Sequence, residues 1–261
     1  KRKAKAEGKE PAPVKKAIKH IPNMKKRHGK RYLAVRELVE REKEYELEEA
    51  IALAKKTSTV KFDSSLELHL NLGVDPRQAD QMVRSSVVLP AGSGKTLRVA
   101  VLVGADKADE AKKAGADKVG ETELMAEIEK GKIDFDILIS TPDMMPKLAK
   151  LAKVLGPKGL MPNPKSGTVT ADPAKAVKEA KAGKLEFRID KQAIVHLAIG
   201  KASFKEEELI QNAKALIQAV MQAKPSAAKG TYVKAMHLTT SMGPGIKLDV
   251  TKAIAAANPR S

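Results

Sequence analysis

The chain of 261 residues has no cysteine and no tryptophan, and aromatic residues make up only 3% of it. Without cysteine there are no disulfides, thiolate metal sites or cysteine nucleophiles. A protein that reads single-stranded bases by stacking needs several exposed rings, so the low aromatic content argues against that class. The apolar cores must therefore be built from Ala, Val, Leu and Ile.

Long apolar runs and negative charge are also scarce. No run approaches the roughly 18 apolar residues that suggest a membrane-spanning helix, and no secretory signal pattern is present. Lys and Arg number 49 against 32 Asp and Glu, which gives a net charge of +17. A surplus of this size favours a polyanionic partner, and we expect nucleic acid and no membrane.

The positive charge is concentrated at the start of the chain. Residues 1–31 are rich in Lys and Arg and contain only Glu7 and Glu10 as acidic residues. This composition predicts that residues 1–27 form a basic arm that is disordered or folds on binding. A solvated tail that adds only solubility is the alternative interpretation.

Two kinds of strand follow along the chain. Residues 66–72 alternate Leu with polar residues, which predicts a half-buried strand of an antiparallel sheet. Residues 185–189, 193–199 and 231–240 behave similarly. Residues 99–103 and 137–139 are continuous apolar runs, typical of parallel strands that are buried on both faces.

Helical patterns separate the strands of the middle. We expect helices over 106–115, 141–155 and 172–183, and βαβ units therefore build a small Rossmann-like α/β domain at 93–183. One or two helices over 33–57, with a break near Tyr45, and a helix opened by a Ser203–Glu206 capping box predict an α+β flank. The fold class is thus α+β and α/β: a discontinuous two-layer α+β sandwich at 28–92 and 184–261, with the 93–183 domain inserted.

Enzyme signatures find little support. The AGSGKT run at 91–96 lacks the first glycine of a phosphate-binding loop, since Leu89 stands in its place, and a strand is expected after it where a helix is needed. A nucleotide-dependent enzyme using Gly92–Thr96 is kept as the alternative function. The five histidines lack ligand spacing, although His69, His196 and His237 lie in separate predicted strands and could share a sheet face. We expect no catalytic residue, no metal ligand and no cofactor.

Three segments have the composition of an RNA-contacting surface. Residues 155–169 (LGPKGLMPNPKSGTV) form a basic, proline-rich loop in which Lys158 and Lys165 can hold phosphates, or else a purely structural connection. Residues 238–246 form a polar turn in which Gly243 permits close backbone approach beside the soft side chain of Met242. Phe62 stands among polar residues at the edge of a predicted sheet, where its ring suits ribose or base contact unless it packs in the core.

These segments resemble the bacterial ribosomal protein L-one family, which belongs to the mobile lateral stalk of the large ribosomal subunit. The resemblance runs from residue 28 to about residue 247. It is carried by HGKRY (28–32), KFD (61–63), LGVDPRQADQMVR (72–84), LPAG (89–92), FDILISTPDMM (135–145), the 155–169 loop, EFRIDK (186–191), IGKASF (199–204), AKGTYVK (228–234) and LTTSMGP (238–244).

The resemblance implies a non-enzymatic structural constituent of the large subunit, with the two-domain organisation expected above. It implies binding to stalk ribosomal RNA, help in releasing deacylated transfer RNA from the exit site, and repression of translation by binding its own messenger. It also implies a monomer within a cytoplasmic ribosome, and an organellar ribosome stays open as an alternative.

Carried over to this sequence, the family's RNA-contacting positions fall on residues from several segments. They are Lys61, Phe62, Glu67, Lys191, Lys201, Ser203, Ser241, Met242 and Gly243. Ser241 departs from the commoner Thr but keeps its hydroxyl. Further candidate contacts are Arg27, His28, Lys30, Arg31, Lys158 and Lys165.

Overall fold

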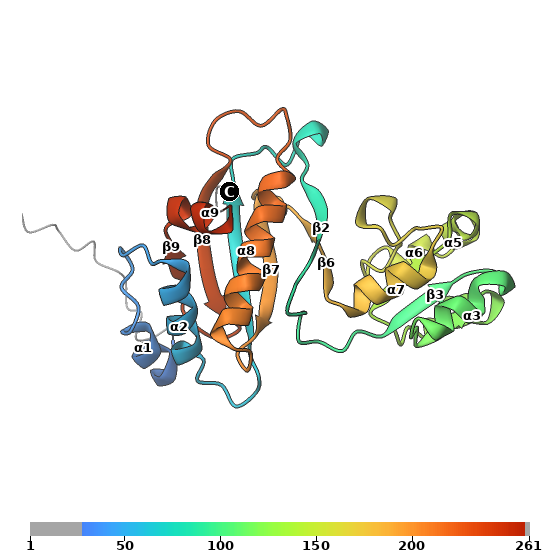
Figure 1. The fold of residues 1–261 in the computed structure, drawn as a ribbon, viewed down its shortest axis with the longest axis horizontal. Helices are drawn as coiled ribbons and strands as arrows, with labels where there is room; N and C mark the ends of the chain where they lie inside the picture. The colour runs from blue at the N-terminus through green and yellow to red at the C-terminus, as the bar shows by residue number, and fades with distance from the viewer. Residues whose placement is uncertain (1–27, 259–261) are drawn as a thin grey trace, which may run out of the picture.

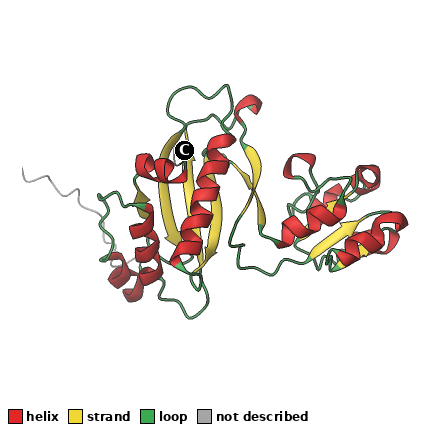
Figure 2. Cartoon of the chain, in the orientation of Figure 1, coloured by secondary structure: helices red, strands yellow, loops and turns green. Residues whose placement is uncertain are grey.

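The structure is a computed structural model that describes residues 28–258. The arm predicted at 1–27 lies outside the described residues. Helices and strands are mixed, and the strands form three sheets (Figures 1 and 2). Within the described range, no helix is both long and apolar enough to cross a membrane.

The largest sheet has four antiparallel strands in the order β7-β1-β8-β9. Its strands are β1 (Ser65–Leu72), β7 (Ile194–Lys201), β8 (Val233–Thr240) and β9 (Ile246–Leu248). The leucines of β1 are buried and its polar residues are half-buried, which confirms the alternation read from the sequence. One face of the sheet is therefore apolar and the other is polar.

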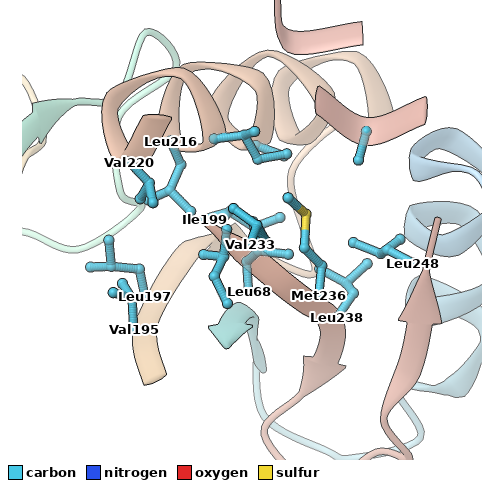
Figure 3. Packing of buried hydrophobic residues seen from close by; sticks show 14 of the residues in the cluster. Leu68, Val195, Leu197, Ile199, Leu216, Val220, Val233, Met236, Leu238 and Leu248 are labelled. Atoms are coloured by element: carbon cyan, nitrogen blue, oxygen red, sulfur yellow. The ribbon is translucent and has the colours of Figure 1, made fainter. Parts of the chain in front are cut away.

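Three helices cover the apolar face. The helices α2 (Leu47–Thr57), α8 (Glu206–Gln222) and α9 (Val250–Ala257) contribute to one hydrophobic core with the sheet. Figure 3 shows Leu216 and Val220 of α8 above Leu68, Val195 and Met236 of the strands. The short helix α1 (Lys30–Arg36) precedes α2, and residues 37–46 between them confirm the predicted break near Tyr45.

A two-stranded ribbon leads away from this sheet. It pairs β2 (Arg84–Val88) antiparallel with β6 (Lys184–Arg188), and Arg84 forms an ion pair with Glu186 across it. The strand at 185–189 is thus confirmed. Its partner β2 follows a short 3₁₀ turn at Ala79–Gln81 and was not predicted.

The middle of the chain builds a three-stranded parallel sheet in the order β4-β3-β5. Its strands are β3 (Val99–Leu102), β4 (Lys118–Gly120) and β5 (Ile137–Ser140). Helices α3 (Ala105–Lys113) and α7 (Pro173–Lys181) pack with Val99 and Val101. Helices α4 (Thr122–Glu129), α5 (Met145–Ala149) and α6 (Ala152–Leu155) pack with Ala100 and Leu102. Successive residues of β3 therefore enter different cores, as expected for a doubly covered sheet.

Two expected helix features differ in the structure. The helix expected at 141–155 is divided into a 3₁₀ turn (Pro142–Met144), α5 and α6. Pro146 explains the boundary before α5, because it lacks an N–H and its ring crowds the carbonyl four residues earlier. A turn at residues 150–151 separates α5 from α6. The Ser203–Glu206 capping box is wrong: α8 begins at Glu206 after Lys205, and the Lys205 N–H donates to Glu208 Oε2 at 3.0 Å. Ser203 is engaged elsewhere, as described below.

The two chain segments that link the ribbon to the parallel sheet touch each other. A Cβ atom at Gly183 would lie 2.8 Å from the Cα of Gly92, and both glycines have positive φ. The buried side chain of Asn212, in α8, forms hydrogen bonds with the backbone at this contact. Its amide accepts from Ala91 N and donates to Gly92 O, each at 3.0 Å, and donates to Ile199 O at 2.8 Å.

Candidate nucleic-acid interface

Three chain segments meet at one end of the four-stranded sheet. Strand β1 begins there, and its antiparallel neighbours β7 and β8 both end there. The loop before β1, the turn after β7 and the turn after β8 consequently lie side by side. This brings together Lys61, Phe62, Glu67, Lys201, Ser203, Ser241, Met242 and Gly243 from the predicted set, which we call the strand-end surface.

Asp63 fixes the first two segments to each other. Its carboxylate accepts from Ser203 N at 3.1 Å and from Ser203 Oγ at 2.8 Å. The ammonium of Lys201 donates to the Asp63 carbonyl at 3.3 Å and to Ser65 Oγ at 3.1 Å. Ser203 therefore contributes to the shape of the surface through Asp63, a residue that the predicted set missed although it belongs to the KFD segment.

A reciprocal pair of hydrogen bonds attaches the third segment. Ser241 N donates to Ser65 O, and Ser65 N donates to Ser241 Oγ, both at 3.1 Å. The second bond uses the hydroxyl that Ser and Thr share. A Thr at this position would therefore make the same hydrogen bond.

Two large apolar side chains point away from the core at this surface. Phe62 is 55% exposed and Met242 is 64% exposed. The core-packing alternative for Phe62 is therefore wrong. Both side chains emerge from segments that are held by hydrogen bonds, and the cations Lys61 and Lys201 belong to the same group of segments. Exposed apolar groups with cations nearby suit contact with bases and riboses.

The turn after β8 tolerates no side chain at its centre. A Cβ atom at Gly243 would lie 2.1 Å from Oγ1 of the buried Thr240, whereas one at Gly245 would meet nothing within 4 Å. The Gly243 N–H donates to Thr240 O at 3.0 Å. Glycine at 243 thus lets the turn close tightly behind Met242.

The polar face of the sheet extends the surface. Glu67 lies where the register of β1 against β7 shifts. Next along that face, His69 pairs with His196 of β7 and with His237 of β8, so these three histidines form a row, called here the histidine row. The Nδ1 atoms of His69 and His196 are 2.8 Å apart, and His196 Nε2 is 3.3 Å from Asp190 Oδ2.

The environment of His69 and His237 lowers the pKa of both side chains. Partial burial lowers the pKa of His69, the nearby His196 and His237 lower it further, and Glu67 opposes the shift. Burial also lowers the pKa of His237, with a further contribution from Lys247. Within residues 28–258, no group of three His, Asp or Glu side chains is arranged to hold a metal ion.

Other predicted residues lie away from the strand-end surface. Lys191 belongs to the turn before β7, so the length of that strand, roughly 25 Å, separates it from Lys201. Lys158 is exposed after α6, in the part built on the parallel sheet. The side chain of Lys165 and the whole of Arg27 lie outside what the structure describes. His28, Lys30 and Arg31 are at or near α1, where the His28 ring stacks on Tyr32 with centroids 4.6 Å apart.

The glycine-rich segment considered as a nucleotide loop lacks the required context. Gly92–Thr96 lies between β2 and β3, and no helix follows it before β3. The strand, loop and helix order of a phosphate-binding loop is therefore absent from this described segment. Instead, a Cβ atom at Gly94 would lie 2.8 Å from the Lys201 side chain and 2.9 Å from the Phe204 ring, so this segment packs against the turn after β7.

The protein is basic and has an α+β fold with exposed apolar side chains and cations at one end of an open sheet. These features are typical of nucleic-acid-binding proteins. The chain matches the Ribosomal protein L1p/L10e family over residues 54–244, and it belongs to that family. It is accordingly a structural constituent of the ribosome that binds ribosomal RNA of the large subunit. The family is one of structural proteins and not of enzymes.

Proposed function

We propose that the protein binds ribosomal RNA of the lateral stalk through the strand-end surface. The observation that carries this proposal is that Phe62 and Met242, from segments about 180 residues apart, are both exposed and both anchored to the start of β1. The apolar pair contacts bases and riboses, Lys61 and Lys201 neutralise phosphates, and Gly243 keeps the backbone accessible.

The domain organisation supports a division of labour. Residues 28–92 and 184–261 form the discontinuous RNA-binding domain of this proposal, and residues 93–183 form the inserted Rossmann-like domain. Separate hydrophobic cores around the antiparallel and the parallel sheets support that division. By the family resemblance, the stalk complex assists release of deacylated transfer RNA from the exit site, and the same surface represses translation by binding the protein's own messenger.

A titration against a stalk-region ribosomal RNA fragment and a scrambled duplex, each at two salt concentrations, tests the proposal. Met242→Ala and Phe62→Ala should each weaken selective binding by about 1–3 kcal/mol, the magnitude of one base–side-chain contact. Met82→Ala is the matched control, because Met82 is 53% exposed and lies outside the strand-end surface. Equal binding of both RNAs by the unaltered protein, collapsing with salt, would contradict the proposal.

A glycine pair provides a second, sharper comparison. Gly243→Ala should abolish most selective affinity, because the new methyl group collides with Thr240 and displaces Met242. Gly245→Ala, two residues further in the same turn, meets nothing within 4 Å and should bind RNA as the unaltered protein does. Similar losses in both variants would mean that turn flexibility, and not the position of Met242, controls binding.

Competition between the two RNA classes tests the regulatory part. If one surface serves both, the stalk fragment should displace the messenger leader, and Met242→Ala should weaken both complexes. Simultaneous binding of the two RNAs would show separate surfaces and would refute repression through the strand-end surface.

A further inference from the structure

A basic cavity of about 370 Å³ lies between α1 and β9, next to the strand-end surface. Its lining contains three permanent cations, Arg36, Arg41 and Lys247, and two histidines, His28 and His237. Glu40 is the one carboxylate among the described lining residues. An anion entering this cavity would therefore meet converging positive groups from helix, loop and strand.

The walls of the cavity are held in place by the backbone. Residue Tyr45 bridges β9: its N–H donates to Lys247 O, and its carbonyl accepts from Asp249 N, both at 2.9 Å. The Tyr45 hydroxyl accepts from Glu40 N at 3.1 Å. The loop that carries Arg41 is thus attached at both of its ends, and the cavity exists before any ligand arrives.

The charges in and around the cavity leave a positive balance. Lys247 Nζ lies 2.6 Å from Glu44 Oε1, which offsets one cation. Arg41 is exposed and makes no hydrogen bond or ion pair with any described residue, so its guanidinium is available to a ligand. A guanidinium in this situation matches the oxygens of a phosphate group.

The cavity is continuous with the strand-end surface. Pro244 and Gly245 line it and directly follow Gly243, and the two residues from 243 to 245 span at most about 7 Å. His237 belongs both to the cavity lining and to the histidine row. A nucleic-acid strand that leaves Met242 therefore meets the cavity next.

We infer that this cavity is a phosphate-binding subsite for the same RNA, holding the backbone beside the nucleotides that contact Phe62 and Met242. The inference rests on the proposed function and adds to it a second anchoring point, in which Arg41 and Lys247 bind phosphate oxygens. No sequence motif marks the subsite, because its residues come from segments about 200 positions apart.

Affinity for the stalk RNA fragment across a series of salt concentrations tests the subsite. Arg41→Gln/Lys247→Gln should lower affinity at least about tenfold at low salt, and should reduce the slope of log K against log salt by about one to two, since each lost phosphate contact removes somewhat less than one unit. Lys112→Gln/Lys113→Gln on α3 removes the same charge from exposed lysines elsewhere and should change affinity less than about threefold.

The outcomes separate the inference from the proposed function. If the unaltered protein binds selectively but the cavity variant matches the α3 control in affinity and slope, the subsite is refuted and the strand-end surface stands. If the unaltered protein shows no selectivity, both fail. Should circular dichroism show that Lys247→Gln unfolds the protein, Arg41→Gln alone must still reduce the slope by somewhat less than one unit, and an unchanged slope would refute the subsite.

Discussion

The parallel and the four-stranded antiparallel sheet differ in how the side chains on their two faces are buried. Every residue of β3 is buried, and its successive side chains enter two different cores. In β1, buried leucines alternate with half-buried polar residues, and α2, α8 and α9 pack on the face that carries the leucines. A sheet covered on both faces can offer a ligand only its loops, whereas a sheet covered on one face also offers the exposed face of its strands. The RNA surface proposed here uses both the face and the end of the open sheet.

The strongest test of this difference between the two sheets is to truncate side chains at adjacent positions of one strand and compare the losses in the free energy of unfolding. Leu138→Ala and Ile139→Ala, adjacent in β5 but in different cores, should each lower the free energy of unfolding by about 2–5 kcal/mol. In β1, Leu70→Ala should cost a similar amount, but Asn71→Ala should cost no more than about 0.5 kcal/mol. Denaturant unfolding of the four variants measures this, and a large loss at Asn71 would contradict the one-sided description.

The stability of the connection between the two sheets should depend on one polar residue, Asn212. Asn212→Ala leaves Ala91 N and the carbonyls of Gly92 and Ile199 without their partner, so we expect a loss of about 1–3 kcal/mol in the free energy of unfolding. The effect is measured by urea denaturation. Gln211→Ala, at the exposed neighbouring position of α8, is the control and should change stability little.

The smallest expected effect is a pH dependence confined to the open sheet, because residues 93–183 contain no histidine. The folded state lowers the pKa of His69 and His237, so the unfolded chain takes up protons first as the pH falls. The free energy of unfolding should therefore decrease as the pH falls below about 6.5, the ordinary histidine value. Unfolding at pH 7.5 and 5.5 should show a smaller decrease in His69→Gln/His237→Gln, and an identical decrease would exclude His69 and His237 as its source.

The sequence predicts elements whose signal is local. The leucines of 66–72 and the apolar runs at 99–103 and 137–139 carry their own periodicity, and the strands formed there. The strands β4 and β9 have three residues each, too few to display alternation, and they form because a neighbouring strand offers hydrogen bonds. The capping box failed because the Ser203 hydroxyl binds Asp63, a residue 140 positions away that no local pattern can reveal.

The candidate site also has one part that the sequence predicts and one part that it does not. Residues close to the ends of predicted strands, such as Phe62, Lys201 and Met242, meet because antiparallel pairing brings those ends together. The separation of Lys191 follows from the same rule, since it precedes the strand that Lys201 ends. The cavity with Arg41 and Lys247 depends on how the loop 37–46 is bridged to β9, and only the folded structure reveals it.

The contact between Gly92 and Gly183 has a mechanical consequence. The two backbones lie next to each other there, and they continue into the paired strands β2 and β6. A force that pulls on residues 93–183 along the ribbon is shared by two covalent chains and acts along β2 and β6, not across their hydrogen bonds. The connection can therefore bear such a force while the hydrogen bonds between β2 and β6 stay intact.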